Sequence, residues 1–441
     1  MSENLSENSF QGELAAPAPV SEQVRISSVD TLRGFALLGI LAMNIYSFAL
    51  PGPAYESTVI YGGATGINRL IWYITYLFFQ EKMMTIFSML FGAGMILMMF
   101  RFRESGQDFK RFYFRRTFWL LMIAIVHAYF IWYGDVLFYY AVVGFILYFF
   151  RNLSARKLLL IASIVLFIGI FAQIGVGVMF SYMRENARET LDLIDQGETL
   201  DEDKQKILDN WLEIEDGLMP DSESIAIEIA AYRGNYWANM GERSSTAISM
   251  QTMSFPFYLL WRIGAIMMIG MAMLKMGIFS AQRSRKFYLL MMILGYTIGL
   301  PLVYLGAVRM ELHSFDLIRI YREDGLYNYV FSLAVVLGHI GLVMLICKSN
   351  ILNWLKKSLA AVGRMALTNY LMDSIVFTTI FYGFGLGLFG RFERAQLMFF
   401  VLGMWIFQMI VSPLWLKYFK FGPAEWLWRS LTYKQFQPMR R

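Results

Sequence analysis

Long uncharged apolar runs recur along this chain and limit what it can fold into. Of its 441 residues, 57% are hydrophobic and only 16% are charged. A helix that crosses a membrane needs about 20 consecutive apolar residues, and in lipid the backbone must satisfy its hydrogen bonds within helices or closed barrels. We therefore predict an all-α, polytopic membrane protein with about ten transmembrane helices. The predicted spans are residues 31–50, 70–100, 112–133, 136–150, 157–181, 255–277, 287–307, 327–347, 367–388 and 396–416.

The apolar runs form two groups that are separated by a long polar stretch. Residues 1–23 are rich in Ser, Glu, Ala and Pro, and we expect a disordered cytoplasmic tail there. A first membrane half of five spans covers 24–182, and a second half of five spans covers 254–417. Between them, residues 183–253 are acidic with apolar residues at helical spacing, which predicts a helical periplasmic insert. Residues 418–441 are predicted to be a cytoplasmic C-terminal tail.

The distribution of basic residues predicts the orientation in the membrane. Clusters of Lys and Arg follow every second apolar run, whereas the connection 51–68 contains neither. The positive-inside rule then places both termini in the cytoplasm and the 183–253 insert on the outer side of the membrane. Because the basic residues are scattered between apolar runs, we expect no nucleic-acid surface. The single Cys347 excludes an intrachain disulfide and a thiolate metal cluster, and we expect no metal site.

One histidine in the first half lies where an ionisable side chain is costly. His127 is near the end of the run 112–133, and a Gly134-Asp135 turn follows before the next run. Ionisable groups at membrane depth point to function by default, and histidine exchanges protons near neutral pH. We expect His127 to be a general base or acyl acceptor in an outward-facing cavity, with Asp135 orienting its ring. A histidine that only bonds within the bundle, and an aspartate that only caps the next helix, are the plainer alternatives.

Two charges interrupt the second apolar run, and two polar residues mark the first. A continuous helix over 70–100 would be about 46 Å long, so we predict a break near Glu81 and Lys82. These charges either line the substrate cavity or lie at the interface with Lys82 snorkelling. Arg33 either binds a phosphate or anchors the first span, and Asn44 contacts another helix or a substrate.

Three stretches of the sequence resemble a known family. They are RISSVDTLRGFALLGILAMNI (25–45), MMTIFSMLFGAGM (83–95) followed by HAYFIWYGDVLFYYAVVGF (127–145), and AVGRMALTNYLMDSIVFTTIFYGFGLGLFG (361–390) with SPLWLKYFKFGPAEWLWRSLTY (412–433). Together they resemble the YeiB-like bacterial inner-membrane proteins, whose C-terminal half is a domain of unknown function. Asp373 stands where the family pattern has Gln.

The YeiB-like family is itself similar to the transmembrane acyltransferases, which include heparan-type glucosamine N-acetyltransferases and bacterial O-acyltransferases of envelope sugars. That group has an Asp-x-x-Arg-Gly opening in the first span, matched by Asp30, Arg33 and Gly34. It also has an amide late in that span, matched by Asn44, and an essential membrane histidine, matched by His127. The resemblance implies an acyl-CoA donor bound from the cytoplasm and an acceptor outside.

We therefore expect a membrane acyltransferase that moves an acyl group from acyl-CoA to a small-molecule, glycan or lipid acceptor of the envelope. His127 and Asp135 would act on the acceptor, and Asn44, Glu81 and Lys82 would line the cavity. The expected donor-binding residues are Arg33, Arg111, Arg115 and Arg116. Two alternatives stay open: a transporter or lipid-handling protein that uses the same polar groups, and a non-catalytic membrane subunit. Membrane lipids are expected partners, and the choice between a monomer and a homo-oligomer is left open.

Overall fold

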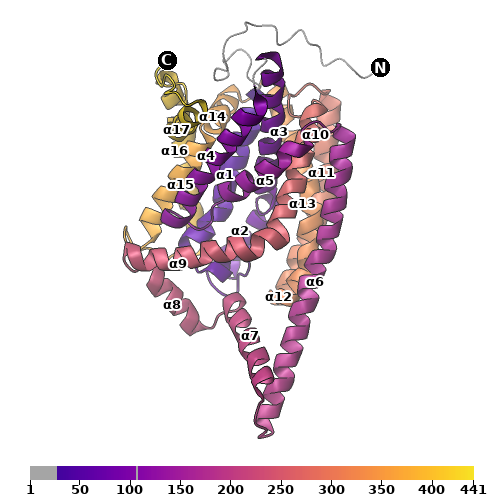
Figure 1. Ribbon diagram of the computed structural model, residues 1–441, viewed down its shortest axis with the longest axis vertical. Coiled ribbons are helices and arrows are strands. Elements are labelled where there is room, and N and C mark those ends of the chain that lie inside the picture. The colour runs from indigo at the N-terminus through magenta and orange to yellow at the C-terminus, as the bar shows by residue number, and fades with distance from the viewer. Residues whose placement is uncertain (1–26, 106–107) are drawn as a thin grey trace.

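The computed structural model describes residues 27–105 and 108–441, and within these ranges it contains helices and no β-strand (Figure 1). The predicted all-α class is therefore confirmed. The predicted tail 1–23 lies outside the described residues. The helices of the first half are α1 Ser27–Ala49, η3 Gly52–Tyr55, α2 Gly66–Phe78, α3 Lys82–Ser105, α4 Phe109–Phe130, α5 Leu137–Leu147, η4 Tyr148–Phe150 and α6 Ala155–Asp195.

The remaining helices comprise the insert and the second half. The insert contains α7 Glu202–Leu218, α8 Ser222–Tyr232 and α9 Tyr236–Ser249. The second half contains η5 Met250–Leu259, α10 Leu260–Lys275, α11 Arg285–Leu312, α12 Leu317–Arg319, η6 Ile320–Asp324, α13 Gly325–Lys348, α14 Asn353–Arg364, α15 Ala366–Phe381, α16 Arg394–Tyr418 and α17 Pro423–Tyr433.

The number of helices that can cross a membrane is smaller than the ten predicted. Among the described residues, six segments are long and apolar enough, namely 27–49, 66–102, 155–195, 285–312, 317–348 and 394–418. A seventh is added if Tyr236–Pro256 and Leu260–Lys275, which meet at 66°, count as one broken span. The other predicted spans are occupied by α4, α5 and α15. These helices fall short because α4 carries basic residues in its first two turns, and α5 and α15 have only 11 and 16 residues.

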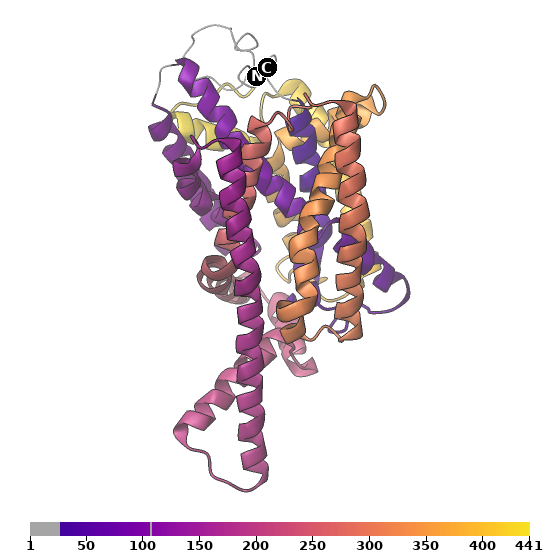
Figure 2. The same cartoon turned by 90° about the vertical axis from the view of Figure 1, so that its right-hand side faces the viewer.

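The two ends of the bundle differ in what they carry (Figures 1 and 2). The terminal end carries α14, α17 and the C-terminus, and the opposite end, which we call the insert end, carries α7, α8 and α9. Helix α6 has 41 residues, which gives a length of about 60 Å, so it extends well beyond the bundle at the insert end. Helix α7 runs back along this extension, and α9 lies across the insert end of the bundle.

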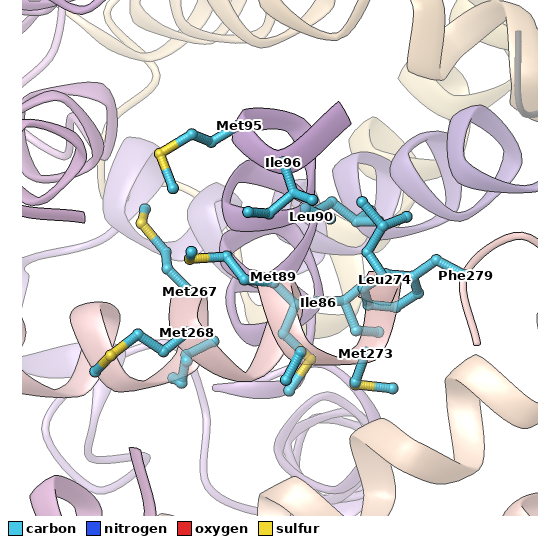
Figure 3. Packing of buried hydrophobic residues seen from close by; sticks show 14 of the residues in the cluster. Ile86, Met89, Leu90, Met95, Ile96, Met267, Met268, Met273, Leu274 and Phe279 are labelled. Carbon is cyan, nitrogen blue, oxygen red and sulfur yellow. The ribbon is translucent and has the colours of Figure 1, made fainter. Parts of the chain in front are cut away.

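The core of the bundle is formed where α3 and α10 cross (Figure 3). A Cβ atom on Gly270 would lie 1.9 Å from the carbonyl oxygen of Met89, and one on Gly92 would lie 2.2 Å from that of Met267. Small residues allow helix backbones to approach this closely in membranes. The flexible side chains of several methionines fill the space on either side of the contact. This crossing holds the broken span against the first half of the chain.

Candidate functional site

The hairpin between α4 and α5 ends inside the bundle. Helices α5 and η4 have 11 and 3 residues, so together they form a rod about 21 Å long, shorter than a hydrocarbon core of about 30 Å. This rod begins at Leu137, two residues after Asp135, and ends at Phe150, just before the Arg151 carbonyl that accepts a hydrogen bond from Lys275 at the end of α10. We expected His127 and Asp135 on the outer side, with the histidine lining a cavity that opens outward. Instead both residues are buried, with exposed fractions of 1% and 2%.

His127 joins two side chains in a buried relay. Its Nδ1 lies 2.7 Å from Asp135 Oδ2, and its Nε2 lies 2.8 Å from Ser374 Oγ. Ser374 belongs to α15 and is 1% exposed. With the Nδ1 proton donated to Asp135, Nε2 is free to accept the hydroxyl proton of Ser374, which is the arrangement of a Ser-His-Asp triad. We call Ser374, His127 and Asp135 the relay.

Asp135 also caps the helix that follows it. Its Oδ1 accepts a hydrogen bond from the backbone N–H of Phe138 at 2.6 Å, while Oδ2 faces His127. The carboxylate thus performs both roles that the sequence left open, since each oxygen has a separate partner. Capping locks the carboxylate rotamer, and that in turn fixes the orientation of the imidazole.

Tyr370 fastens the hairpin tip to α15, one turn before Ser374. Its hydroxyl accepts a hydrogen bond from Val136 N at 3.1 Å and lies 3.3 Å from the carbonyl oxygen of Gly134, to which it donates. Its ring centroid lies 5.2 Å from that of His127. Asp373, next to Ser374, is held by Gln408, whose Nε2 donates to Asp373 Oδ1 at 2.6 Å. The serine is therefore positioned by contacts on both sides.

Sequence reasoning missed Ser374, because it lies 247 residues from His127 in an apolar stretch. The only available signal was its place in the YLMDSIVF segment, where two adjacent polar residues interrupt an otherwise apolar helix. A polar pair of this kind inside a buried helix needs partners, and the structure supplies Gln408 and His127.

The insert covers the relay from the insert end. Arg243 of α9 is fully buried, and its Nη1 donates to the carbonyl oxygens of Ile131 at 2.6 Å and Phe130 at 3.3 Å. The Tyr236 hydroxyl donates to the same Phe130 carbonyl at 2.8 Å. These carbonyls end α4, and a cation is favoured at a helix C-terminus. The contacts place α9 directly over the last turn of α4, the turn that contains His127.

Glu81 and Lys82 lie in a different buried cluster. The predicted break occurs here, between α2 and α3, with Glu81 at a φ of 68°. Lys82 Nζ donates to the Tyr76 carbonyl at 2.7 Å and to Asn328 Oδ1 at 2.5 Å, and Glu81 pairs with Arg262 at 2.8 Å. These two charged residues stabilise the break between α2 and α3, because Glu81 pairs with α10 and Lys82 bonds to α13.

Asn44 does not join the relay either. It is half-buried in α1, and within the described part of the chain it forms no hydrogen bond with His127, Asp135 or Ser374.

The predicted donor-binding arginines separate into two sets. Arg33 pairs with Asp30 at 2.9 Å, and Arg116 lies within electrostatic range of both Arg33 and Arg429 of α17. The guanidinium of Arg116 lies 3.6 Å from the ring centroid of Trp428. Arg115 is half-buried on the same helix, whereas the side chain of Arg111 is exposed in its first turn. The structure thus brings Arg33 and Arg116 together at the terminal end and adds Arg429.

Among the described residues, no cluster of three or more His, Cys, Asp or Glu side chains could hold a metal ion.

Comparison with known proteins places the chain in a family. A family model described as a protein of unknown function (DUF418) matches residues 273–435. The chain is 30% identical over 436 residues to the uncharacterized protein YxaH of Bacillus subtilis (strain 168), covering 96% of this chain and 97% of that protein. It is 28% identical over 431 residues to the uncharacterized protein YeiB of Escherichia coli (strain K12), covering 93% and 97%. The chain belongs to the YeiB-like family.

The YeiB-like resemblance expected from the sequence is confirmed, and no solved structure matches this member of the family. The names of these two relatives assign no activity. Ser374 lies inside the matched DUF418 region, whereas His127 and Asp135 lie outside it. The relay therefore joins the two halves of the protein.

Proposed function

We propose that this YeiB-like protein is a membrane-embedded acyltransferase that carries an acyl group on Ser374. The observation that supports the proposal is the relay: a serine hydroxyl, an imidazole and a carboxylate at 2.8 Å and 2.7 Å, all within the thickness of the bundle. A serine is a weak nucleophile by itself, and an adjacent base oriented by a third group activates it. The donor class, acyl-CoA, follows from the family resemblance and from the basic residues at the terminal end.

The first half of the reaction forms an acyl-serine. Ser374 Oγ attacks the thioester carbonyl carbon while His127 Nε2 accepts the hydroxyl proton and Asp135 stabilises the imidazolium. The carbon–sulfur bond then breaks, and His127 returns the proton to the leaving thiolate, so CoA departs as a thiol. The second half repeats these steps with an acceptor hydroxyl or amine as the nucleophile. His127 takes its proton and gives it to Ser374 as the ester bond breaks.

The two substrates would approach from opposite ends. Ser374 lies eight residues after Ala366, about 12 Å along α15 from its terminal end. Arg33 and Arg116 lie at that end, where they are suited to bind the phosphates of a donor. The acceptor would enter at the insert end when α9 moves. Until then α9 keeps water away from the acyl-serine, which limits its hydrolysis.

Mass spectrometry of the intact protein tests the proposal. Protein in lipid nanodiscs is mixed with short-chain or long-chain acyl-CoA, and the expected product is one acyl adduct on Ser374. Ser374→Ala should abolish the adduct, and His127→Ala should slow its formation by about 10²–10⁴-fold. Ser412→Ala is the matched control, since Ser412 is also fully buried but bonds to Asn369 and not to a histidine.

The outcomes separate the three candidate functions. Absence of an adduct with every acyl-CoA tested, on folded protein, refutes the acyltransferase. If lipid or acyl-CoA binds but no adduct forms, the result supports the lipid-handling function. If neither ligand binds, the result supports the non-catalytic subunit.

A further inference from the structure

Four buried polar atoms that have no hydrogen-bond partner among the described residues lie between the insert and the bundle. They are Arg243 Nη2, Trp132 Nε1, Tyr382 Oη and Asn239 Oδ1. Their residues are at most 2% exposed. An unpartnered buried polar atom costs about 1–3 kcal/mol, so several in one place indicate a partner that is not part of the chain.

The contacts of these residues place them in one layer. Arg243 bonds to the carbonyl of Ile131, next to Trp132. Arg243 Nε also donates to the carbonyl of Asn239 at 3.3 Å, and Asn239 Nδ2 donates to the carbonyl of Tyr232 at 3.1 Å. The Tyr232 carbonyl in turn accepts from Gly383 N at 2.9 Å, beside Tyr382.

This layer adjoins the relay on the side of the insert. The ring centroids of Trp132 and His127 are 6.4 Å apart, and the backbone N–H of Trp132 donates to the His127 carbonyl at 2.9 Å. A group bound in the layer would therefore place its neighbouring atoms close to His127.

The charge of the layer favours an anion. Arg243 is always ionised, and within the described ranges no carboxylate pairs with it, since its hydrogen bonds there go to backbone carbonyls. A buried charge needs compensation, which the end of α4 provides only in part. Two acids, Glu228 of α8 and Glu242 of α9, lie within electrostatic range of Tyr232, but Glu228 accepts a bond from Gly52 N and the side chain of Glu242 is exposed.

We infer that this layer binds an anionic head group, a phosphate or carboxylate that carries a neighbouring hydroxyl. Arg243, Trp132 and Tyr382 supply donors for the anionic oxygens, and Asn239 Oδ1 accepts from the hydroxyl. Identification of this ligand as the acceptor of the acyl group rests on the proposed function. The binding itself does not, because it is measured without acyl-CoA.

The test measures binding with defined probes. The melting temperature of purified protein is followed with glycerol 3-phosphate, which has both groups, and with glycerol, which lacks the anion. Native mass spectrometry compares retention of phosphatidylglycerol with that of phosphatidylcholine. We expect stabilisation by glycerol 3-phosphate or selective retention of phosphatidylglycerol, and the arm that responds distinguishes a soluble ligand from a lipid.

Three variants identify the site. Trp132→Phe and Tyr382→Phe each remove one unpartnered atom, so probe affinity should fall by about tenfold in both. The ligand-free melting temperature should stay level or rise in Tyr382→Phe, whereas in Trp132→Phe it should fall, because the smaller ring leaves a cavity beside Phe48. Arg243→Gln should abolish the response, although it also loosens α9. Tyr113→Phe is the control: its hydroxyl donates to the Gly144 carbonyl at 3.0 Å, far from the layer, so stability should fall and the probe response should persist.

A response to glycerol equal to that of glycerol 3-phosphate would overturn the inference, as would no response to any probe. So would an unchanged response in both Trp132→Phe and Tyr382→Phe. Each of these results would assign the unpartnered atoms to water.

Discussion

Replacement of Asp135 by asparagine should separate its two roles. The Oδ1 atom caps α5 through Phe138 N, and Oδ2 accepts the Nδ1 proton of His127. Asparagine caps a helix about as well as aspartate, so Asp135→Asn keeps the cap. Its NH₂ group then faces Nδ1 and donates to it, which moves the ring proton to Nε2. In that tautomer Nε2 can no longer accept the proton of Ser374.

The expected magnitudes follow from these contacts. Asp135→Asn exchanges a charge-assisted hydrogen bond for a neutral one, a loss of about 1 kcal/mol in the free energy of unfolding. Asp135→Ala also loses the cap and leaves His127 unpaired, a loss of about 2–4 kcal/mol. The same wrong tautomer in a serine-protease triad lowers the rate about 10⁴-fold, so acylation of Ser374 in Asp135→Asn should fall by a similar factor.

Two measurements on the same samples separate the capping role of Asp135 from its role in the relay. They are the melting temperature and the rate of acyl-adduct formation on Ser374. Asp324→Asn is a matched control, since Asp324 is fully buried and pairs with His313 at 2.6 Å, away from the relay. It should lower the melting temperature and leave acylation unchanged. If Asp135→Asn acylates Ser374 at the wild-type rate, Asp135 is a cap alone and the relay reasoning is wrong.

Three further predictions concern stability and orientation. Gly363→Ala should lower the melting temperature sharply, because the new Cβ would lie 2.0 Å from the Asp30 carbonyl oxygen. Gly94→Ala is the control: no atom lies within 4 Å of its new Cβ, so the melting temperature should stay level or rise. Burial raises the pKa of Glu228 from 4.5 to about 7, so the stability it contributes is present below its unfolded value and lost as pH rises through 7. Glu228→Gln should therefore flatten the fall in melting temperature between about pH 5 and pH 8, and an unchanged slope would contradict the assignment. A cysteine at the exposed Ser222, after replacement of Cys347, should react only with reagent outside the cell, whereas labelling from the cytoplasm alone would reverse the orientation.

The sequence predicted where the helices lie, but it did not predict which of them are long enough to cross a membrane. Each predicted run contains a helix, because apolar residues without breakers favour one in lipid. The predicted number of membrane spans was too high because three of the apolar runs contain helices that are too short or too basic to cross a membrane. Helix α15 is an example: nine of its 16 residues are buried, since it packs inside the bundle beneath the insert.

The sequence by itself predicted the membrane class, a break near Glu81 and Asp135 as a candidate partner of His127. These are local properties: only eight residues separate His127, in the last turn of α4, from Asp135, in the turn before α5, so the connection itself keeps the two side chains close. Only the tertiary structure decided that Ser374 completes the relay and that Arg243 covers it. Which faces of distant helices meet depends on packing over the whole bundle, and periodicity within one helix carries no information about a partner 247 residues away.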